Sequence, residues 1–289
     1  MSTVNLVGHN EHLNNFISLY KLNKLPAKIL LSGKKGIGKS LLINHFLFKI
    51  FENTNSKLLI ENSTHPNLLY IKKKHDKKNI EVDQIREVIK FTYQSSLNNK
   101  SRFIIIDDVE FLNINSANAL LKSLEEPNKN VYFFLIFNSE MKILDTIKSR
   151  CLEYKIDLKI KDTNIIVDNY FNDEIFVTIN NTLIDYYSTP KFLISLVNYL
   201  RENDLSISST NINQLIKNII ENKHYIKDSF VKDYLNYIIE LFFYNHINKT
   251  KKFSYNVKKY YFFKLSNIRK FNLDHESFFL EFEDKLLSE

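Results

Sequence analysis

Three short apolar runs with polar residues at their ends are the clearest pattern in the N-terminal half of the chain. They cover Ile29–Leu31, Phe103–Ile106 and Val131–Phe137. Uninterrupted runs of this length are typical of strands that are buried on both faces of a parallel sheet. Between them, apolar residues at helical spacing predict helices over Leu41–Ile50 and Asn115–Leu124. This half therefore predicts an α/β fold.

The C-terminal half shows helical patterns only. Helix-like apolar clusters occupy Ile175–Leu183 and Phe192–Leu200, and longer ones occupy Ile216–Ile220, Leu235–Phe243 and Phe278–Leu287. We therefore expect helices after about residue 160, with wide apolar faces that pack against one another.

Length and composition exclude several classes of protein. At roughly 100 to 200 residues per domain, 289 residues suggest two or three domains. The single cysteine excludes an internal disulfide and a cysteine-rich zinc site, and no apolar run approaches the ~18 residues of a membrane span. The N-terminus lacks the charged-then-apolar order of a signal peptide, so we expect a cytoplasmic protein that does not contact a membrane.

The clearest chemical motif contains three of the only four glycines in the chain. Its residues follow the pattern G-x-x-x-x-G-K-S, and the predicted cofactor-binding set is Gly33, Lys34, Lys35, Gly36, Ile37, Gly38, Lys39, Ser40 and Leu41. Glycines let consecutive N–H groups turn toward a triphosphate, and the following helix N-terminus favours negative charge. We expect Lys39 to reach the terminal phosphates of ATP and Ser40 to bind Mg²⁺. A plain glycine-rich turn is the alternative.

A second element of a phosphate-binding site is an acidic residue at the end of a buried strand. Phe103–Ile106 is followed by Asp107 and Asp108. The carboxyl end of a central parallel strand opens on the ligand crevice, which makes Asp107 the second candidate ligand for Mg²⁺. A buried strand that ends in an acidic turn is the alternative interpretation.

The predicted helix over Asn115–Leu124 ends in two glutamates that helix propensity does not explain. The helix over Asn115–Leu124 continues to Glu125 and Glu126, and Pro127 should end it. Negative charges in the last turn oppose the helix dipole at a cost of roughly 0.3 to 1 kcal/mol each. Local stability alone therefore does not explain them.

Four segments together resemble the clamp-loader branch of the AAA-plus ATPases. They are Gly33–Ser40, Ile104–Asp108, Asn118–Pro127 and Thr146–Cys151. Within that branch, His65–Leu68 and Ile80–Arg86 resemble the delta-prime subunits of bacterial DNA polymerase III. The resemblance covers about residues 5 to 155 well.

The resemblance implies a role for several residues. Arg150 would reach across a subunit boundary to the γ-phosphate of a neighbour, as an arginine finger. Asn138 would sense the γ-phosphate, and Lys191 would lie near a second sensor. Asp108 stands where many relatives have a glutamate that orients the attacking water, and its shorter side chain predicts weak or absent hydrolysis. A surface salt bridge is the alternative role for Arg150.

The resemblance also implies an architecture and partners. We expect an AAA-plus domain over residues 1–160, a helical lid over 161–205 and a helical collar for oligomerisation over 206–289. The partners would be tau/gamma and delta subunits in a hetero-pentamer, the sliding clamp, and primed DNA through the assembled complex. Many relatives have a four-cysteine zinc module, but residues 52–80 contain no cysteine, so no zinc is expected.

Three rival functions stay open. A tau/gamma-type motor ATPase would hydrolyse ATP itself, but it usually has the zinc cysteines and an Asp-Glu pair. A small-molecule kinase would leave the segments around Glu125 and Arg150 unexplained, and a scaffold would bind no nucleotide.

The net charge of +7 permits an anionic partner without naming one. We interpret the lysine run at 72–78 as a solvated loop. The aromatics at 253–261, among further lysines, are interpreted as core, with nucleic-acid contact as the alternative in both places.

Overall fold

The computed structural model describes residues 6–51, 54–74, 77–94, 100–125, 130–246, 254–271 and 273–287, with the backbone only at 54–56 and 269. Contacts divide the chain into two compact units, Met1–Asp162 and Thr163–Glu289. Each unit is described by itself below. Within the described ranges, no helix is both long and apolar enough to cross a membrane.

The first unit is built on a parallel sheet. Within the described residues the sheet has five strands in the order β2-β3-β4-β1-β5. Their bounds are β1 Lys28–Gly33, β2 Leu68–Ile71, β3 Arg102–Ile106, β4 Val131–Asn138 and β5 Leu152–Lys155. The three predicted strands are confirmed as β1, β3 and β4, which lie next to one another in the sheet. The predicted α/β fold class is therefore confirmed.

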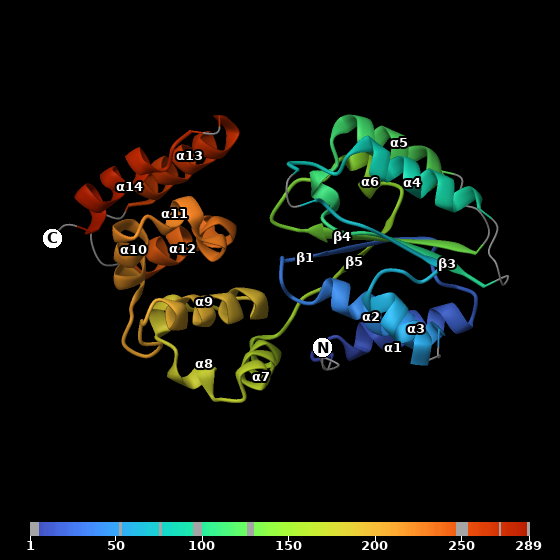
Figure 1. The fold of residues 1–289 in the computed structure, drawn as a ribbon, viewed down its shortest axis with the longest axis horizontal. Helices are drawn as coiled ribbons and strands as arrows, with labels where there is room; N and C mark the ends of the chain where they lie inside the picture. The colour runs from blue at the N-terminus through green and yellow to red at the C-terminus, as the bar shows by residue number, and fades with distance from the viewer. Residues whose placement is uncertain are drawn as a thin grey trace. The chain divides into compact units, whose positions relative to one another are not determined.

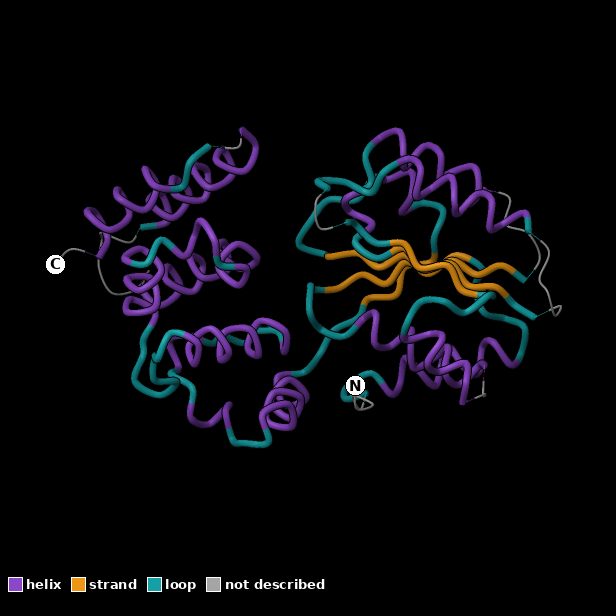
Figure 2. Tube along the Cα trace, viewed as in Figure 1, coloured by secondary structure: helices purple, strands orange, loops and turns teal. Residues whose placement is uncertain are grey.

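Helices cover both faces of this sheet, which explains why its strands lack polar alternation. Figure 2 shows the strands between two layers of helix, and Figure 1 identifies α1, α2 and α3 on one face and α4, α5 and α6 on the other. Along β3, Phe103 and Ile105 join the core of the first face, whereas Ile104 and Ile106 join that of the second. The bounds of the helices are α1 Asn10–Lys21, α2 Lys39–Phe51, α3 Thr54–Glu61, α4 Val82–Tyr93, α5 Ile114–Glu125 and α6 Asp145–Lys148.

Aromatic rings fill the core under α1 and α2. Phe16, Phe46 and Phe134 are fully buried and meet edge-on or tilted, with ring centroids 5.6 to 6.3 Å apart. Such geometry adds to the burial of their large apolar surfaces. This packing fixes α2 against β1 and β4, and the N-terminus of α2 begins the site described below. The prediction that Pro127 ends α5 lies outside the described residues.

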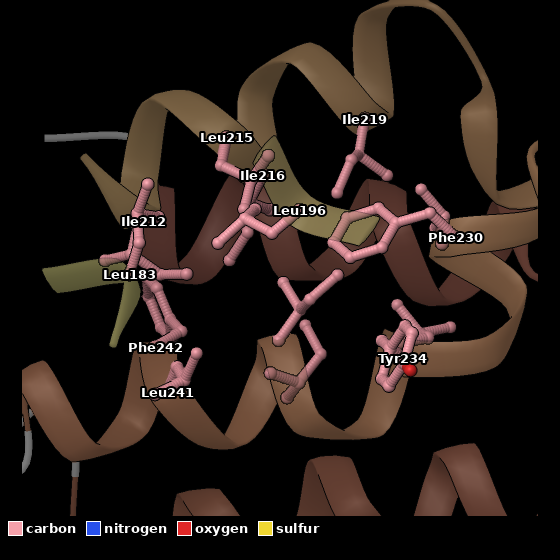
Figure 3. Packing of buried hydrophobic residues seen from close by; sticks show 14 of the residues in the cluster. Leu183, Leu196, Ile212, Leu215, Ile216, Ile219, Phe230, Tyr234, Leu241 and Phe242 are labelled. Atoms are coloured by element: carbon pink, nitrogen blue, oxygen red, sulfur yellow. The ribbon is translucent and has the colours of Figure 1, made fainter. Parts of the chain in front are cut away.

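The second unit is helical throughout its described residues. Its elements, from α7 at the boundary, are α7 Ile160–Phe171, α8 Ile175–Thr178, the 3-10 turn η2 Asn181–Leu183, α9 Pro190–Glu202, α10 Ile212–Glu221, α11 His224–Lys227, α12 Ser229–His246, α13 Tyr255–Phe271, α14 Glu276–Phe282 and the π-helical turn η4 Glu283–Leu287. Figure 3 shows Leu196, Ile216 and Phe230 from three of these helices converging in one core. The division into lid and collar stays a prediction.

Two local expectations for this unit differ from the structure. The cluster Ile175–Leu183 forms two short helical segments, because Ile179 is extended and the side chain of Asn180 accepts a hydrogen bond from the Thr182 N–H to begin the second. Tyr261 is buried as expected, but Tyr260 is 44% exposed and Tyr255 is 70% exposed, so the core interpretation was wrong for these two. A helix of 17 residues that packs on one side leaves its other side in solvent.

Arg102 is a structural arginine that ties the start of β3 to the end of α4. It is buried, its guanidinium donates to the backbone carbonyls of Phe91 and Thr92, and it lies over the Phe91 ring. Replacing Arg102 with methionine keeps the apolar contact but leaves both carbonyls without a charged donor. We expect a loss of about 2 kcal/mol in local stability, measured as a roughly 30-fold faster hydrogen exchange of the β3 amides.

The matched control for this variant is Arg86→Met on helix α4, the helix that Arg102 contacts. Arg86 is exposed, and its guanidinium donates to the carboxylate of Asp83 at 2.7 Å. An exposed pair of this kind contributes at most about 1 kcal/mol, so β3 exchange should stay within about threefold of wild type. Equal effects of the two substitutions would contradict a structural role for Arg102.

Candidate functional site

The loop between β1 and α2 has a conformation that only glycine adopts easily. Gly36 and Gly38 have φ values of 88° and 96°, in the left-handed region. At Gly33, a Cβ atom would lie 2.2 Å from the backbone oxygen of Ile156, so a side chain would collide with that neighbouring segment of the backbone. The three glycines of the motif therefore allow the tight turn and the close approach that a phosphate-binding loop requires.

Lys39, the first residue of α2, points back into the loop. It is 6% exposed, and its ammonium donates to the backbone oxygens of Gly33 at 2.7 Å and Lys34 at 2.6 Å. Burial lowers the pKa of Lys39 to about 8, although the carboxylates of Glu110 and Asp107 oppose this. The loop therefore holds a positive charge that its own carbonyls stabilise in place of a phosphate.

Asp107 collects hydrogen-bond donors from three elements at the end of β3. Its Oδ2 atom accepts from the Ser40 hydroxyl at 3.2 Å and from the Tyr70 hydroxyl at 2.8 Å. The ammonium of Lys72 lies 3.4 Å from the same oxygen. The structure thus brings Ser40 and Asp107 together as the sequence predicted, and it adds two residues that the sequence analysis did not assign to the site.

The described residues of the lysine run at 72–78 form a loop in which Lys72 is exposed, as interpreted, but the sequence did not predict that Lys72 contacts Asp107. Lys72 follows β2 directly, and β2 lies beside β3 in the sheet, so its side chain reaches the carboxyl end of β3. Lys74 and Lys77 instead pair with Glu81, at 3.8 and 3.0 Å. Adjacency of β2 and β3 was the missing information, because a charge run alone does not show which strand lies next to it.

Two further acidic residues, Asp108 and Glu110, follow Asp107. Asp108 has a left-handed backbone with φ of 60°, and burial, with the charge of Asp107, raises the pKa of its carboxyl group. Burial also raises the pKa of Glu110, whose carboxylate accepts a hydrogen bond from the backbone N–H of Asn138 at 3.2 Å. Glu110 was not predicted as a site residue, and its position two residues after Asp108 on a 3-10 turn gave no signal in the sequence.

Asn138 lies at the end of β4, opposite Gly33 in the register of β1 and β4. Its side-chain oxygen accepts from the N–H of Glu140, and the carboxylate of Glu140 lies 3.4 Å from the Lys34 ammonium. Parallel strands end at the same edge of a sheet, and this brings Asn138 to the loop. The predicted neighbourhood of Asn138 and the loop is therefore present.

His9 braces the loop from outside. It is 1% exposed, and its Nε2 atom lies 2.6 Å from the backbone oxygen of Ile37. Burial lowers the pKa of His9, so the neutral imidazole with a proton on Nε2 donates to that carbonyl. His9 thereby holds the segment before α1 against the loop.

Arg150 lies at the surface of the first unit, between α6 and β5, with about a third of its side chain exposed. Its Nε and one terminal nitrogen donate to Glu125 Oε1, at 3.1 and 2.7 Å, and the other terminal nitrogen donates to the Thr146 carbonyl at 3.0 Å. The guanidinium therefore lies at the surface of its own unit, where it contacts Glu125 and Thr146, and it is not buried inside that unit. Glu125, which opposes the dipole of α5, has Arg150 as its partner.

Lys191 lies in the second unit, directly after Pro190 at the start of α9. The Thr189 side chain caps this helix by accepting a hydrogen bond from the Phe192 N–H. Lys191 lines a cleft of about 320 Å³ with Ser195, Asn198 and other residues of α9 and α12. Its sensor role stays a prediction.

The donor atoms at the loop fit a hydrated Mg²⁺ ion. Ser40 Oγ and Asp107 Oδ2 lie 3.2 Å apart, and Mg²⁺ needs only one or two protein oxygens when phosphate and water supply the others. Tyr70 and Lys72 already contact the same Asp107 oxygen. An ion that binds there directly would compete with them for this oxygen.

Comparison with known proteins gives a consistent result. The family described as "DNA polymerase III, delta subunit" matches residues 8–159. "DNA polymerase III subunit delta'" of Pseudomonas aeruginosa is 33% identical over 134 residues, which are 43% of this chain and 41% of that protein. The protein of the same name from Buchnera aphidicola subsp. Schizaphis graminum is 27% identical over 225 residues, which are 73% of this chain and 66% of that protein.

The chain therefore matches between about two fifths and two thirds of the length of these relatives. Among solved structures, a DNA polymerase III gamma subunit-related protein from Thermotoga maritima has a TM-score of 0.50 and 16% sequence identity. The match covers 93% of this chain and 96% of that one. At this identity the similarity shows the fold.

Proposed function

Since this chain belongs to the DNA polymerase III delta subunit family, we propose that it is a delta-prime subunit of a clamp loader. In this proposal it binds ATP with Mg²⁺ at the loop of residues 33–41 and presents Arg150 to the nucleotide of a neighbouring subunit. Its partners are tau/gamma and delta subunits in a hetero-pentamer that loads a sliding clamp onto primed DNA. The position of Arg150 at the surface, held by an exposed glutamate, is the observation that carries this proposal.

The loop supports ATP binding through groups that are already in place. Backbone N–H groups of the glycine turn and of the first residues of α2 would face the phosphates. Lys39 would exchange two carbonyl contacts for contacts to phosphate oxygens, which carry full negative charge and form stronger hydrogen bonds. Ser40 and Asp107 would hold Mg²⁺, which neutralises part of the phosphate charge.

Weak hydrolysis of this ATP follows from the residue after Asp107. Asp108 is one methylene shorter than the glutamate of relatives, so its reach to the attacking water should be poorer. Asn138 would hold its side chain near the terminal phosphate because β4 ends beside Gly33. The pocket is then a binding site whose occupancy stabilises the subunit.

Titration of labelled ATP onto the isolated protein, followed by an assay of phosphate release, tests this proposal. We expect saturable binding and turnover at or below the background of a Lys39→Ala variant. Rapid turnover would instead identify a motor subunit of the tau/gamma type, and absence of binding would identify a scaffold. Either result would overturn the proposed role of the loop.

The depressed pKa of Lys39 predicts that ATP affinity falls at alkaline pH. In the empty pocket the ammonium loses its proton near pH 8, whereas a bound phosphate would keep it protonated, so binding above pH 8 takes up a proton. With a pKa near 8, affinity should be about 30-fold weaker at pH 9.5 than at pH 7.

Calorimetry in two buffers of different ionisation enthalpy at pH 8.5 measures the same effect independently. The observed binding enthalpy should differ between the buffers, because a proton is taken from the buffer when ATP binds. A constant affinity from pH 7 to 9.5, with no dependence on the buffer, would show that Lys39 stays charged in the empty pocket.

A further inference from the structure

The Oδ2 atom of Asp107, a candidate Mg²⁺ ligand, already has three side chains in contact with it. It accepts from Ser40 and Tyr70, and the Lys72 ammonium lies 3.4 Å away. The other oxygen, Oδ1, accepts from the backbone N–H of Asp108 at 3.0 Å. A carboxylate oxygen offers two lone pairs, so a metal ion or its bound water has to displace one of these donors.

Lys72 is held in this position by its own backbone. The Ile71 carbonyl accepts from the Asp107 N–H at 2.8 Å, which joins the end of β2 to the end of β3. The Lys72 carbonyl accepts from the Gln84 side chain at 2.9 Å, and Gln84 also closes the capping box of α4. Two hydrogen bonds thus fix the backbone on either side of the point from which the Lys72 side chain reaches Asp107.

Among the three donors, Lys72 alone carries a charge. Asp107 is 7% exposed, and a buried carboxylate next to a triphosphate needs a compensating cation. Mg²⁺ meets this need in a site of this kind, but here an ammonium already lies at the same oxygen. Lys72 is also half exposed, so it can leave at a smaller cost than the Tyr70 hydroxyl, whose residue packs against the core.

We propose that Lys72 is an internal cation that competes with Mg²⁺ for Asp107, so that this chain binds ATP with little dependence on Mg²⁺. The inference rests on the proposed ATP binding and deepens it, because it assigns the charge balance of the same site. Lys72 acts as a positioning and charge-compensating residue. With Mg²⁺ absent, it keeps Asp107 from repelling the phosphates.

The test is the affinity for ATP of the full chain, measured by calorimetry in excess Mg²⁺ and in EDTA, for wild type and Lys72→Ala. Wild type should lose less than about threefold in affinity when EDTA replaces Mg²⁺. Lys72→Ala should lose at least about tenfold, because removing the cation leaves the buried carboxylate of Asp107 uncompensated beside the triphosphate.

Three control variants separate charge from other effects. Lys72→Arg keeps a cation at Asp107 and should restore the wild-type response to EDTA. Lys74→Ala removes a lysine of the same loop that pairs with Glu81, and it should also respond as wild type does. Tyr70→Phe removes a neutral donor to the same oxygen, so its response to EDTA should match wild type even if its affinity changes.

Each outcome decides a separate question. A strong Mg²⁺ requirement in wild type, or an equal response to EDTA in wild type and Lys72→Ala, would overturn the inference while leaving ATP binding in place. No ATP binding by wild type under either condition would overturn the proposed function, and the inference with it. Circular dichroism of each variant serves as the check that it is folded.

Discussion

A reconstituted clamp loader that contains the Arg150→Ala variant should hydrolyse ATP about 10³-fold more slowly at the site next to this subunit. An arginine finger stabilises the charge that develops on the transferred phosphoryl group, and it does so with a planar fork of donors. Here the fork is assembled at the surface, with three of its N–H groups on Glu125 and Thr146. The measurement is single-turnover phosphate release in the presence of primed DNA and clamp.

Two further substitutions show whether charge or geometry matters. Lys148→Ala removes a positive charge two residues away, at the end of α6, where it pairs with Glu153 at 3.2 Å. Its effect should stay below about threefold, since exposed pairs contribute little. Arg150→Lys keeps the charge without the fork and should recover only a small part of the rate. Normal DNA-stimulated hydrolysis and clamp loading by Arg150→Ala would overturn the finger role.

The Lys39→Ala variant should bind ATP about 100-fold more weakly, which corresponds to about 2.7 kcal/mol. Lys39 is the buried cation of the loop, and its ammonium has two backbone carbonyls as partners that it can exchange for phosphate oxygens. An alanine leaves the phosphates with backbone donors and the helix dipole only. Calorimetric titration with ATP at pH 7 measures the loss.

Lys35→Ala is the matched control for Lys39→Ala. Lys35 would face the phosphates with its backbone N–H, which alanine keeps, and its side chain is exposed, so the substitution should weaken ATP binding less than about threefold. Hydrogen exchange of α2 amides in both variants without ATP shows whether the loop keeps its fold. Equal losses of affinity for the two variants would mean that general electrostatic attraction, not the buried ammonium, binds the nucleotide.

Local patterns predicted β1, β3, β4 and the loop because each is specified by adjacent residues. The apolar runs at 29–31, 103–106 and 131–137 needed no partner information to be recognised as strands buried on both faces. The glycine motif likewise specifies its own turn, since two of its glycines have positive φ. The neighbourhood of Asp107, Asn138 and the loop then follows from the shared edge of parallel strands.

Contacts between elements could not be predicted in this way. Lys72 reaches Asp107 because β2 is the neighbour of β3, and Glu125 reaches Arg150 although 25 residues separate them. Considered singly, the charges of Lys72 and Arg150 have an ordinary interpretation as solvated surface charges. Glu110 was missed because its burial depends on the 3-10 turn that follows Asp108. The order of the strands and the paths of the loops decide these contacts, and neither can be predicted from a single sequence in this way.

The pair of Arg150 and Glu125 also bears on the subunit before assembly. A bare guanidinium at the surface of a protein with a net charge of +7 would attract nucleic acid and other stray polyanions in the cell. Glu125 pairs with this guanidinium, and an exposed pair contributes at most about 1 kcal/mol, so a γ-phosphate of the proposed neighbouring subunit would replace the carboxylate at little cost. In the proposed finger role, Glu125 would therefore neutralise Arg150 before assembly and release it at a small energetic cost.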